Sequence, residues 1–315
     1  MSNSPISRIE PAAGMVLVRG SRFRMGSERH YREEAPVREV EVEDFSIDAH
    51  AVTNRDFARF VKETGYLTIA ERPLDPALYP GAEPAALKPG AMVFRQPRGP
   101  ARGPSRHWSQ WWAYVPGACW RKPEGGPSVF RGRLEHPVVC VAFEDAAVYA
   151  AWAGKALPTE AQWEYAARGG LDGAEFTWGD EPRPGGHYMA NTWQGEFPWR
   201  NDASDGYERT APVGSFPPNG FGLYDMAGNV WEWTTSWYLD AAAPASPCCG
   251  APAEPPPESF DPAQPDVRIP RKVVKGGSYL CDPNSCYRFR PAARQPQMID
   301  TATTHIGFRC VRPIG

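Results

Sequence analysis

The sequence predicts a single α+β domain built from short strands, a few helices and long ordered loops. The chain has 315 residues, enough to bury roughly three-quarters of its unfolded surface without disulfide bonds. It contains 30 Gly and 35 Pro, which break long regular elements. The 42% of hydrophobic residues, with 12 Trp, supply a core and argue against disorder. We find no internal repeat and no hinge-like linker, which favours one domain.

The first elements are expected to be strands followed by a helix. Apolar runs at 15–18 and 22–26, and the alternation of acid and valine at 39–43, are typical of short strands. A helix is expected after Thr53, which can cap it, and Gly65 is expected to end it. The apolar face of this helix contains Phe57, Phe60 and Val61.

Two proline-rich segments interrupt this pattern, at about 73–132 and 241–270. The first contains four tryptophans, which a linker seldom carries, so we interpret it as a long ordered loop packed on the body. Residues 1–12 are expected to be a flexible N-terminus, and residues 13–315 are expected to form the domain.

The remaining sequence predicts two helices and then short strands. The helices are expected at 144–153 and 159–169, the second of which begins with a capping box, TEAQ. Strands are expected at 230–237, 273–274 and 308–311. The residues expected to be buried are Trp163, Ala166 and Ala167 on the second helix, with Trp231, Trp233 and Trp237 on one face of the first strand.

Charge and hydropathy exclude several classes of partner. The 34 Lys and Arg against 37 Asp and Glu give a net charge of −3, so no nucleic acid or anionic membrane partner is expected. No stretch approaches the roughly 18 apolar residues of a membrane span. Residues 1–11 lack the apolar region of a secretory signal. Seven cysteines cannot all pair, which favours a cytoplasmic chain with free thiols.

The strongest chemical feature is a pair of cysteines, Cys281 and Cys286, after a predicted strand. Two glycines just before the pair let backbone approach closely, and Pro283 with Asn284 favours a turn that brings the thiols together. Two adjacent thiolates are soft donors that suit Cu(I). Spacing alone leaves two alternatives open, a pair of inert buried cysteines or a structural zinc site. The zinc site would take its ligands from Cys281, Cys286, His305 and Cys310.

Two other segments carry oxygen donors that suit Ca2+. In the first, the donors would come from Asn191, Thr192, Asp205 and Tyr207. In the second, they would come from Asp225, Gly228, Val230 and Glu232. Neither segment has the spacing of an EF-hand loop, and ordinary polar turns are the alternative.

Together these residues resemble the formylglycine-generating enzymes, also called sulfatase-modifying factors, over nearly the whole chain. The Gly-Asn-Val-Trp-Glu-Trp and Gly-Phe-Arg motifs recur in a wider superfamily, whereas the cysteine pair after Lys-Gly-Gly-Ser points to the oxidase. The resemblance implies a domain of the sulfatase-modifying-factor or C-type-lectin-like kind. The segments that carry it are GMVLV at 14–18, FRMGS at 23–27, LPTEAQWEYA at 157–166, NTWQGEFP at 191–198, PPNGFGLYDMAGNVWEW at 217–233, KGGSYLC at 275–281 and THIGFRC at 304–310.

The resemblance implies an oxidase that converts the cysteine of a Cys-x-Pro-x-Arg motif, in an unfolded or nascent sulfatase, to Cα-formylglycine. The family uses O2, a thiol reductant and Cu(I), which would be bound here by Cys281 and Cys286. Ser278 matches an active-site serine of the family, and Trp231 matches a tryptophan beside the substrate. The two Ca2+ ions of the family carry over to the two oxygen-rich segments named above.

The chain departs from its relatives at three positions. Asp282 and Ser285 stand where some relatives have His and Tyr, and Pro291 stands where secreted relatives have a disulfide cysteine. The last departure fits a cytoplasmic, bacterial type. Two other functions stay open, a non-catalytic peptide- or ligand-binding module on the same fold and an iron-dependent sulfoxide synthase. The latter normally adds a His-rich domain, and the six histidines here are dispersed.

Overall fold

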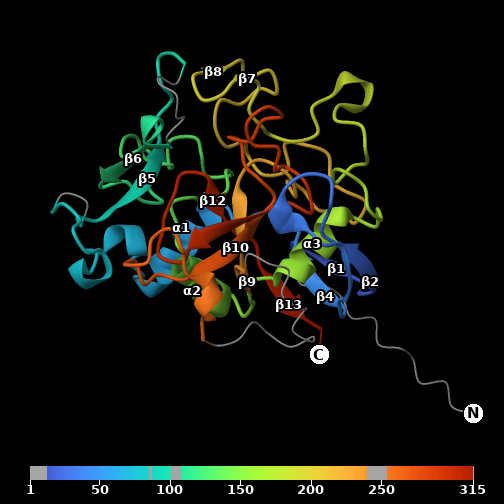
Figure 1. The fold of residues 1–315 in the computed structure, drawn as a ribbon, viewed down its shortest axis with the longest axis horizontal. Coiled ribbons are helices and arrows are strands. Elements are labelled where there is room, and N and C mark those ends of the chain that lie inside the picture. The colour runs from blue at the N-terminus through green and yellow to red at the C-terminus, as the bar shows by residue number, and fades with distance from the viewer. Residues whose placement is uncertain (1–12, 85–86, 101–107, 240–253, 315) are drawn as a thin grey trace, which may run out of the picture.

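The computed structural model describes residues 13–84, 87–100, 108–239 and 254–314 (Figure 1). The N-terminus that was expected to be flexible, 1–12, lies outside the described residues. The same holds for the first part of the second proline-rich segment.

A four-stranded sheet lies at the centre of the fold, with the order β11-β10-β9-β12. Its strands are β9 (Trp231–Trp237), β10 (Arg271–Lys275), β11 (Arg294–Met298) and β12 (Ile306–Gly307). β10 pairs antiparallel with β9 and β11, whereas β12 runs parallel to β9. The loop between β10 and β11 contains both cysteines of the predicted pair, so the central sheet fixes the two ends of that loop.

A three-stranded antiparallel sheet has the order β1-β4-β13. Its strands are β1 (Met15–Val18), β4 (Phe45–Asp48) and β13 (Val311–Pro313). Because β1 and β13 both pair with β4, the two ends of the described chain meet in this sheet. A separate antiparallel pair is formed by β2 (Arg22–Met25) and β3 (Arg38–Glu41).

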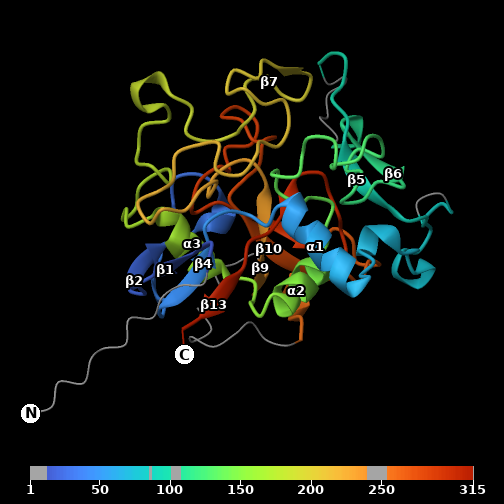
Figure 2. The same cartoon turned by 180° about the vertical axis from the view of Figure 1, so that it is seen from behind.

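Three α-helices flank the central sheet: α1 (Asn54–Thr64), α2 (Phe143–Trp152) and α3 (Glu160–Arg168). The predicted caps are confirmed. The Thr53 side chain accepts a hydrogen bond from the Asp56 amide, Gly65 ends α1 at a φ of 69°, and Thr159 caps α3 in a capping box. α1 and α2 lie on one side of β9 and β10, and α3 lies on the other side near β1 and β2 (Figures 1 and 2).

The first proline-rich segment contains a hairpin that the sequence did not predict. β5 (Gly90–Phe94) pairs antiparallel with β6 (Trp112–Pro116). The hairpin is joined to the body by hydrogen bonds from the Met92 amide to the Ala302 carbonyl at 2.9 Å and from the Thr304 amide to the Met92 carbonyl at 3.1 Å. The described part of this segment therefore packs on the body.

Short elements complete the fold. β7 (Gly195–Glu196) and β8 (Arg200–Asn201) form a small hairpin at the end of the molecule where long irregular loops gather (Figure 1). Turns of 3-10 helix lie at Arg32–Glu34, Ile69–Glu71, Pro76–Leu78, Trp108–Gln110, Pro184–Gly186 and Pro257–Ser259. None of the helices in the described residues is both long and apolar enough to cross a bilayer.

The strand predicted at 308–311 is wrong for most of its length. β12 ends before it at Gly307, and β13 begins only at Val311. Between these strands the backbone passes from the central sheet to the three-stranded sheet, and the Phe308 carbonyl accepts a hydrogen bond from the Val52 amide at 2.9 Å. The apolar pattern here reflects burial rather than a strand. β4 was missed because its alternation of apolar and polar residues is only four residues long, although all four are buried in the structure.

Aromatic side chains fill the core, as the composition predicts. Trp163, Trp231 and Trp233 are at most 1% exposed. Trp237 is half-buried, and the Lys272 ammonium lies 3.3 Å from the centroid of its ring. The expected burial therefore holds for the beginning of β9 and weakens toward its end.

Candidate active site

The two predicted cysteines lie side by side on the loop between β10 and β11. The Sγ atoms of Cys281 and Cys286 are 3.0 Å apart, and both thiols are free. The Cys281 amide donates to the Ser278 carbonyl at 2.9 Å, which starts the turn. Gly277 has a φ of 74°, and a Cβ there would lie 2.8 Å from the Arg288 carbonyl oxygen. The close backbone approach expected from the two glycines is present, and the loop brings both sulfurs to one point.

The two thiols are electrostatically unequal. Cys281 is buried, and desolvation raises its pKa well above the usual value. Cys286 is half-buried, and the hydrogen bond from the Cys281 thiol lowers its pKa, as does the nearby Arg288 guanidinium. Arg288 is held by Glu33 at 2.6 Å and lies 3.7 Å from the ring centroid of Tyr31. Cys286 is therefore the more acidic thiol of the pair.

We expect a single fast-reacting thiol in this loop of the metal-free protein. The pKa of Cys286 is lowered, so its thiolate is populated at a lower pH than that of Cys281, whose pKa is raised. Alkylation by iodoacetamide, followed at each cysteine by peptide mass spectrometry over about pH 6 to 9, should therefore begin at lower pH for Cys286. Arg288→Met should move that curve to higher pH. Identical curves for the two cysteines would contradict the assignment.

Ser278 is buried next to the thiol pair and contacts a histidine. Its Oγ lies 3.3 Å from Nδ1 of His305 and accepts a hydrogen bond from the Leu280 amide at 3.3 Å. The imidazole packs against Trp112, with ring centroids 4.7 Å apart, and burial lowers the pKa of His305 to about 3. The ring is therefore neutral at physiological pH, with one nitrogen as donor and the other as acceptor. The neutral ring and the Ser278 hydroxyl are hydrogen-bond partners, and the tautomer of the ring decides which of them donates.

Trp231, the other predicted active-site residue, is the first residue of β9. Its amide donates to the His305 carbonyl at 2.9 Å, and its side chain is 1% exposed within the same hydrophobic cluster as Cys281. The structure thus brings all four predicted active-site residues into one region. Sequence reasoning named His305 only as a possible zinc ligand and did not name Arg288, because the contacts of both with the site come from tertiary packing and not from a local motif.

The zinc alternative is wrong. The Cys310 amide donates to Asp48 Oδ2 at 2.9 Å in the three-stranded sheet, whereas His305 contacts Ser278. Within the residues that the structure describes, no three or more His, Cys, Asp and Glu side chains group closely enough to hold a metal ion. Among the described residues the thiol pair therefore lacks the third and fourth ligands that a closed structural zinc site needs.

The first oxygen-rich set meets around Asp205. The Thr192 and Tyr207 amides donate to its two carboxylate oxygens at 3.1 and 3.0 Å. Burial raises the pKa of Asp205. Asn191, next to Thr192 in the chain, is 1% exposed, and its Oδ1 has no hydrogen-bond partner among the described residues. The unpaired Asn191 amide oxygen and the half-buried Asp205 carboxylate are the kinds of oxygen donor that Ca2+ prefers.

Three members of the second set lie on a tight turn that touches the first set. Asp225 and Gly228 have φ values of 54° and 73°, and Val230 is buried at the end of the turn. A Cβ at Gly228 would lie 2.2 Å from the Asn191 carbonyl oxygen. Burial also raises the pKa of Asp225, so a cation there would offset an unfavourable buried charge.

Glu232, the fourth member of that set, does not fit a calcium site. Its two carboxylate oxygens accept hydrogen bonds from Arg309 at 2.7 and 2.8 Å. The Trp163 indole also donates to Glu232 at 2.7 Å. Because a buried guanidinium already neutralises this carboxylate, Glu232 is a structural partner of Arg309 in this arrangement.

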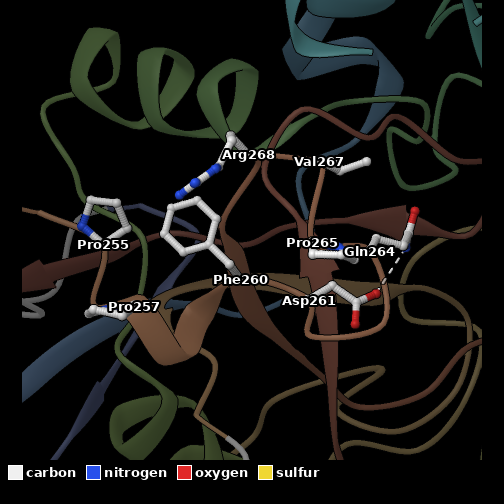
Figure 3. Close-up of a pocket in the computed structure, with 8 residues that line it drawn as sticks. All are labelled: Pro255, Pro257, Phe260, Asp261, Gln264, Pro265, Val267 and Arg268. Carbon is white, nitrogen blue, oxygen red and sulfur yellow. Dashed lines mark hydrogen bonds between the residues drawn. The ribbon is translucent and has the colours of Figure 1, made fainter. Parts of the chain in front are cut away.

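A surface pocket of about 240 Å³ lies elsewhere, in the segment before β10 (Figure 3). Its lining residues are Pro255, Pro257, Phe260, Asp261, Gln264, Pro265, Val267 and Arg268. Figure 3 shows the hydrogen bond from Gln264 to Asp261, which is 2.9 Å long. None of the predicted site residues lines this pocket, so it is separate from the thiol pair.

Comparison with known proteins shows which sequences and folds this chain is similar to. Residues 3–314 match the family model described as sulfatase-modifying factor enzyme 1-like domain. The chain is 55% identical to the formylglycine-generating enzyme of Mycobacterium tuberculosis, covering 94% of this chain and 97% of that one. It is 46% identical to the formylglycine-generating enzyme of Thermomonospora curvata, covering 96% and 94%. The fold is similar to that of PvdO from Pseudomonas aeruginosa, with a TM-score of 0.62, 24% identity and coverage of 95% and 94%.

Proposed function

We propose that this chain, which belongs to the sulfatase-modifying factor enzyme family, generates formylglycine with a Cu(I) ion held by Cys281 and Cys286. The family membership carries the activity: the chain is an enzyme that converts a cysteine to formylglycine in the maturation of sulfatases. The copper site, the residues that serve it and the substrate motif are our proposals.

The observation that supports copper is the pair of free sulfurs 3.0 Å apart on one loop. Two cysteine sulfurs form the soft donor set that Cu(I) prefers over harder cations. When bound, Cu(I) would supply a centre for the substrate thiolate and for O2. Cys286 is the more acidic of the two thiols, and binding of the cation would displace the protons of both cysteines to solvent.

The surrounding residues orient and shield this pair. Ser278 offers a hydroxyl that is hydrogen-bonded to His305 and can also hydrogen-bond a polar group of the bound substrate. Cys281 and Trp231 are both buried in the main hydrophobic cluster, which keeps water from the inner side of the pair. We propose a cytoplasmic setting, in which thiols stay reduced, and this agrees with the five free cysteines among the described residues.

The proposed reaction takes one peptidyl cysteine, one O2 and two reductant thiols to one formylglycine, one H2S, one H2O and one disulfide. The substrate would be an unfolded or nascent sulfatase with a Cys-x-Pro-x-Arg motif. Mass spectrometry of such a peptide, incubated with copper-loaded protein, O2 and a thiol, tests the proposal. We expect an aldehyde product. A peptide that binds but never yields aldehyde at any copper loading would identify a binding module instead.

Removing the His305 imidazole is expected to lower kcat by about tenfold to a hundredfold, the usual cost of losing a partner that orients a reactive group. His305→Leu removes the hydrogen bond to Ser278. His305→Asn places an amide near the position of Nδ1 and should retain most of the activity. Steady-state kinetics of both variants would measure the difference. Equal losses in both would mean that the ring acts only by packing.

We also propose two Ca2+ ions, one held by Asn191, Thr192, Asp205 and Tyr207, the other by Asp225, Gly228 and Val230. Chelation should lower the melting temperature, because ions present at a hundred times their Kd contribute about 2.7 kcal/mol. For a domain of this size that is roughly 4 °C for each ion. Asp205→Ala should weaken the response to calcium, whereas Asp202→Ala, at a half-exposed carboxylate, should keep it. A melting temperature that is insensitive to chelator would contradict the proposal.

A further inference from the structure

Asp282 organises the loop that contains the two cysteines. It is 1% exposed, although the three residues after it are exposed. Its Oδ1 accepts hydrogen bonds from the amides of Asn284 at 2.7 Å and Ser285 at 3.2 Å, and its Oδ2 accepts one from the Ser285 hydroxyl. Its carbonyl accepts a further hydrogen bond from the Cys286 amide at 3.1 Å. Asp282 alone thus accepts the hydrogen bonds from the three amides and the one hydroxyl that point into the loop.

The two sulfurs depend on this arrangement to different degrees. Cys281 is 1% exposed and packs in the main hydrophobic cluster, and its amide is bonded to the Ser278 carbonyl. Cys286 is half-buried, and its amide is bonded to the Asp282 carbonyl inside the loop. Loosening the loop would therefore move Cys286 more than Cys281. A mobile Cys286 would lose conformational entropy each time it is brought back beside Cys281. This entropy loss would oppose a disulfide between the two sulfurs and the binding of one metal ion by both.

We propose that Asp282 and Ser285 are positioning residues, which hold the Cys286 sulfur beside Cys281 before a metal arrives. The hydrogen bond from the Ser285 hydroxyl to Asp282 Oδ2 joins the two side chains, so they act as one unit. The inference deepens the proposed copper site and rests on it for its catalytic consequence. The placement of the sulfurs can be measured without copper or substrate.

The test is the thiol–disulfide equilibrium of the metal-free full chain in glutathione buffers. The protein dithiol and one glutathione disulfide give the protein disulfide and two glutathione thiols, so the equilibrium constant reports how well the two sulfurs meet. The peptide that contains Cys281 and Cys286 is quantified by mass spectrometry after acid quenching. Asp282→Ala should lower this constant by about tenfold to a hundredfold, because several hydrogen bonds to a carboxylate are lost. Asp282→Asn keeps an oxygen acceptor for both amides and should change it less.

Ser285→Ala tests the same hydrogen bond at an exposed residue, so this variant should fold even if Asp282→Ala does not. It should lower the constant severalfold in the natural background and add little to Asp282→Ala, since the two side chains act through one hydrogen bond. Asn284→Ala is the matched control: it lies in the same loop and keeps the amide that Asp282 accepts from, so it should leave the constant unchanged. Affinity for Cu(I), measured by competition with a chromophoric chelator, should fall in the same order.

Unchanged equilibrium constants in both Asp282→Ala and Ser285→Ala, in proteins with a normal melting transition, would overturn the inference. The expected shifts in these constants, together with a failure of the natural protein to make formylglycine with copper, would speak against the copper oxidase and leave the positioning role standing. The two proposals therefore fail in distinguishable ways.

Discussion

Replacing either Cys281 or Cys286 by serine is expected to reduce formylglycine production by roughly 10³-fold or more, as for groups on which a reaction depends as a unit. A hydroxyl has nearly the volume of a thiol, but it is a hard donor that binds Cu(I) poorly. The double variant should be no worse than either single variant, because one sulfur alone does not complete the site. Product formation on a Cys-x-Pro-x-Arg peptide would measure all three, with bound copper determined in parallel.

Cys310→Ala is the matched control for these variants. Cys310 is also buried and free, but it lies beside Asp48 in the three-stranded sheet, away from the thiol pair. Its loss removes one small side chain from the core and no ligand. We expect activity close to that of the natural protein. An active Cys281→Ser protein would refute the two-thiolate assignment.

Arg309→Met is expected to destabilise the fold by about 3 to 5 kcal/mol, the cost of leaving one charge of a buried pair without its partner. Arg309 and Glu232 are at most 1% exposed and are bonded at 2.7 and 2.8 Å. Without the guanidinium, the Glu232 carboxylate keeps only the hydrogen bond from Trp163 to offset its desolvation. Thermal unfolding should begin about 10 °C lower.

Two further variants serve as controls for the Arg309→Met prediction. Arg22→Met removes an arginine whose partner, Glu41, lies 3.5 Å away with both side chains more than two-thirds exposed, so it should cost less than about 1 kcal/mol. The double variant Arg309→Met with Glu232→Leu removes both buried charges and should recover much of the loss. A double variant as unstable as Arg309→Met would mean that lost packing, and not an unpaired charge, sets the cost.

Local patterns in the sequence predicted the parts of the fold that have local causes. The caps of α1 and α3 follow from Thr53 and Thr159, and the cysteine pair follows from a short loop with glycines before it. β4 and the β5–β6 hairpin were missed. The alternating pattern of β4 is only four residues long, and prolines and glycines dominate the sequence around the hairpin.

The residues of the candidate site also fall into those that a local motif identifies and those that only tertiary packing brings together. Cys281, Cys286 and Ser278 lie within nine residues of one another, so a motif can identify them. His305 directly precedes β12, and the pairing of β12 with β9 brings it to the site. Glu33, in the N-terminal part of the chain, forms an ion pair with Arg288. Contacts over such sequence distances depend on how the sheets pack, which spacing does not encode.

The β5–β6 hairpin has a consequence for anyone who wishes to shorten this protein. It sits in a segment that resembles a dispensable insertion, yet its Met92 and Phe94 are hydrogen-bonded to residues 302–304, and its Trp112 covers the His305 ring. Trimming the two strands would admit water to that imidazole and let it gain a proton. A minimal version of this catalyst must therefore retain both strands.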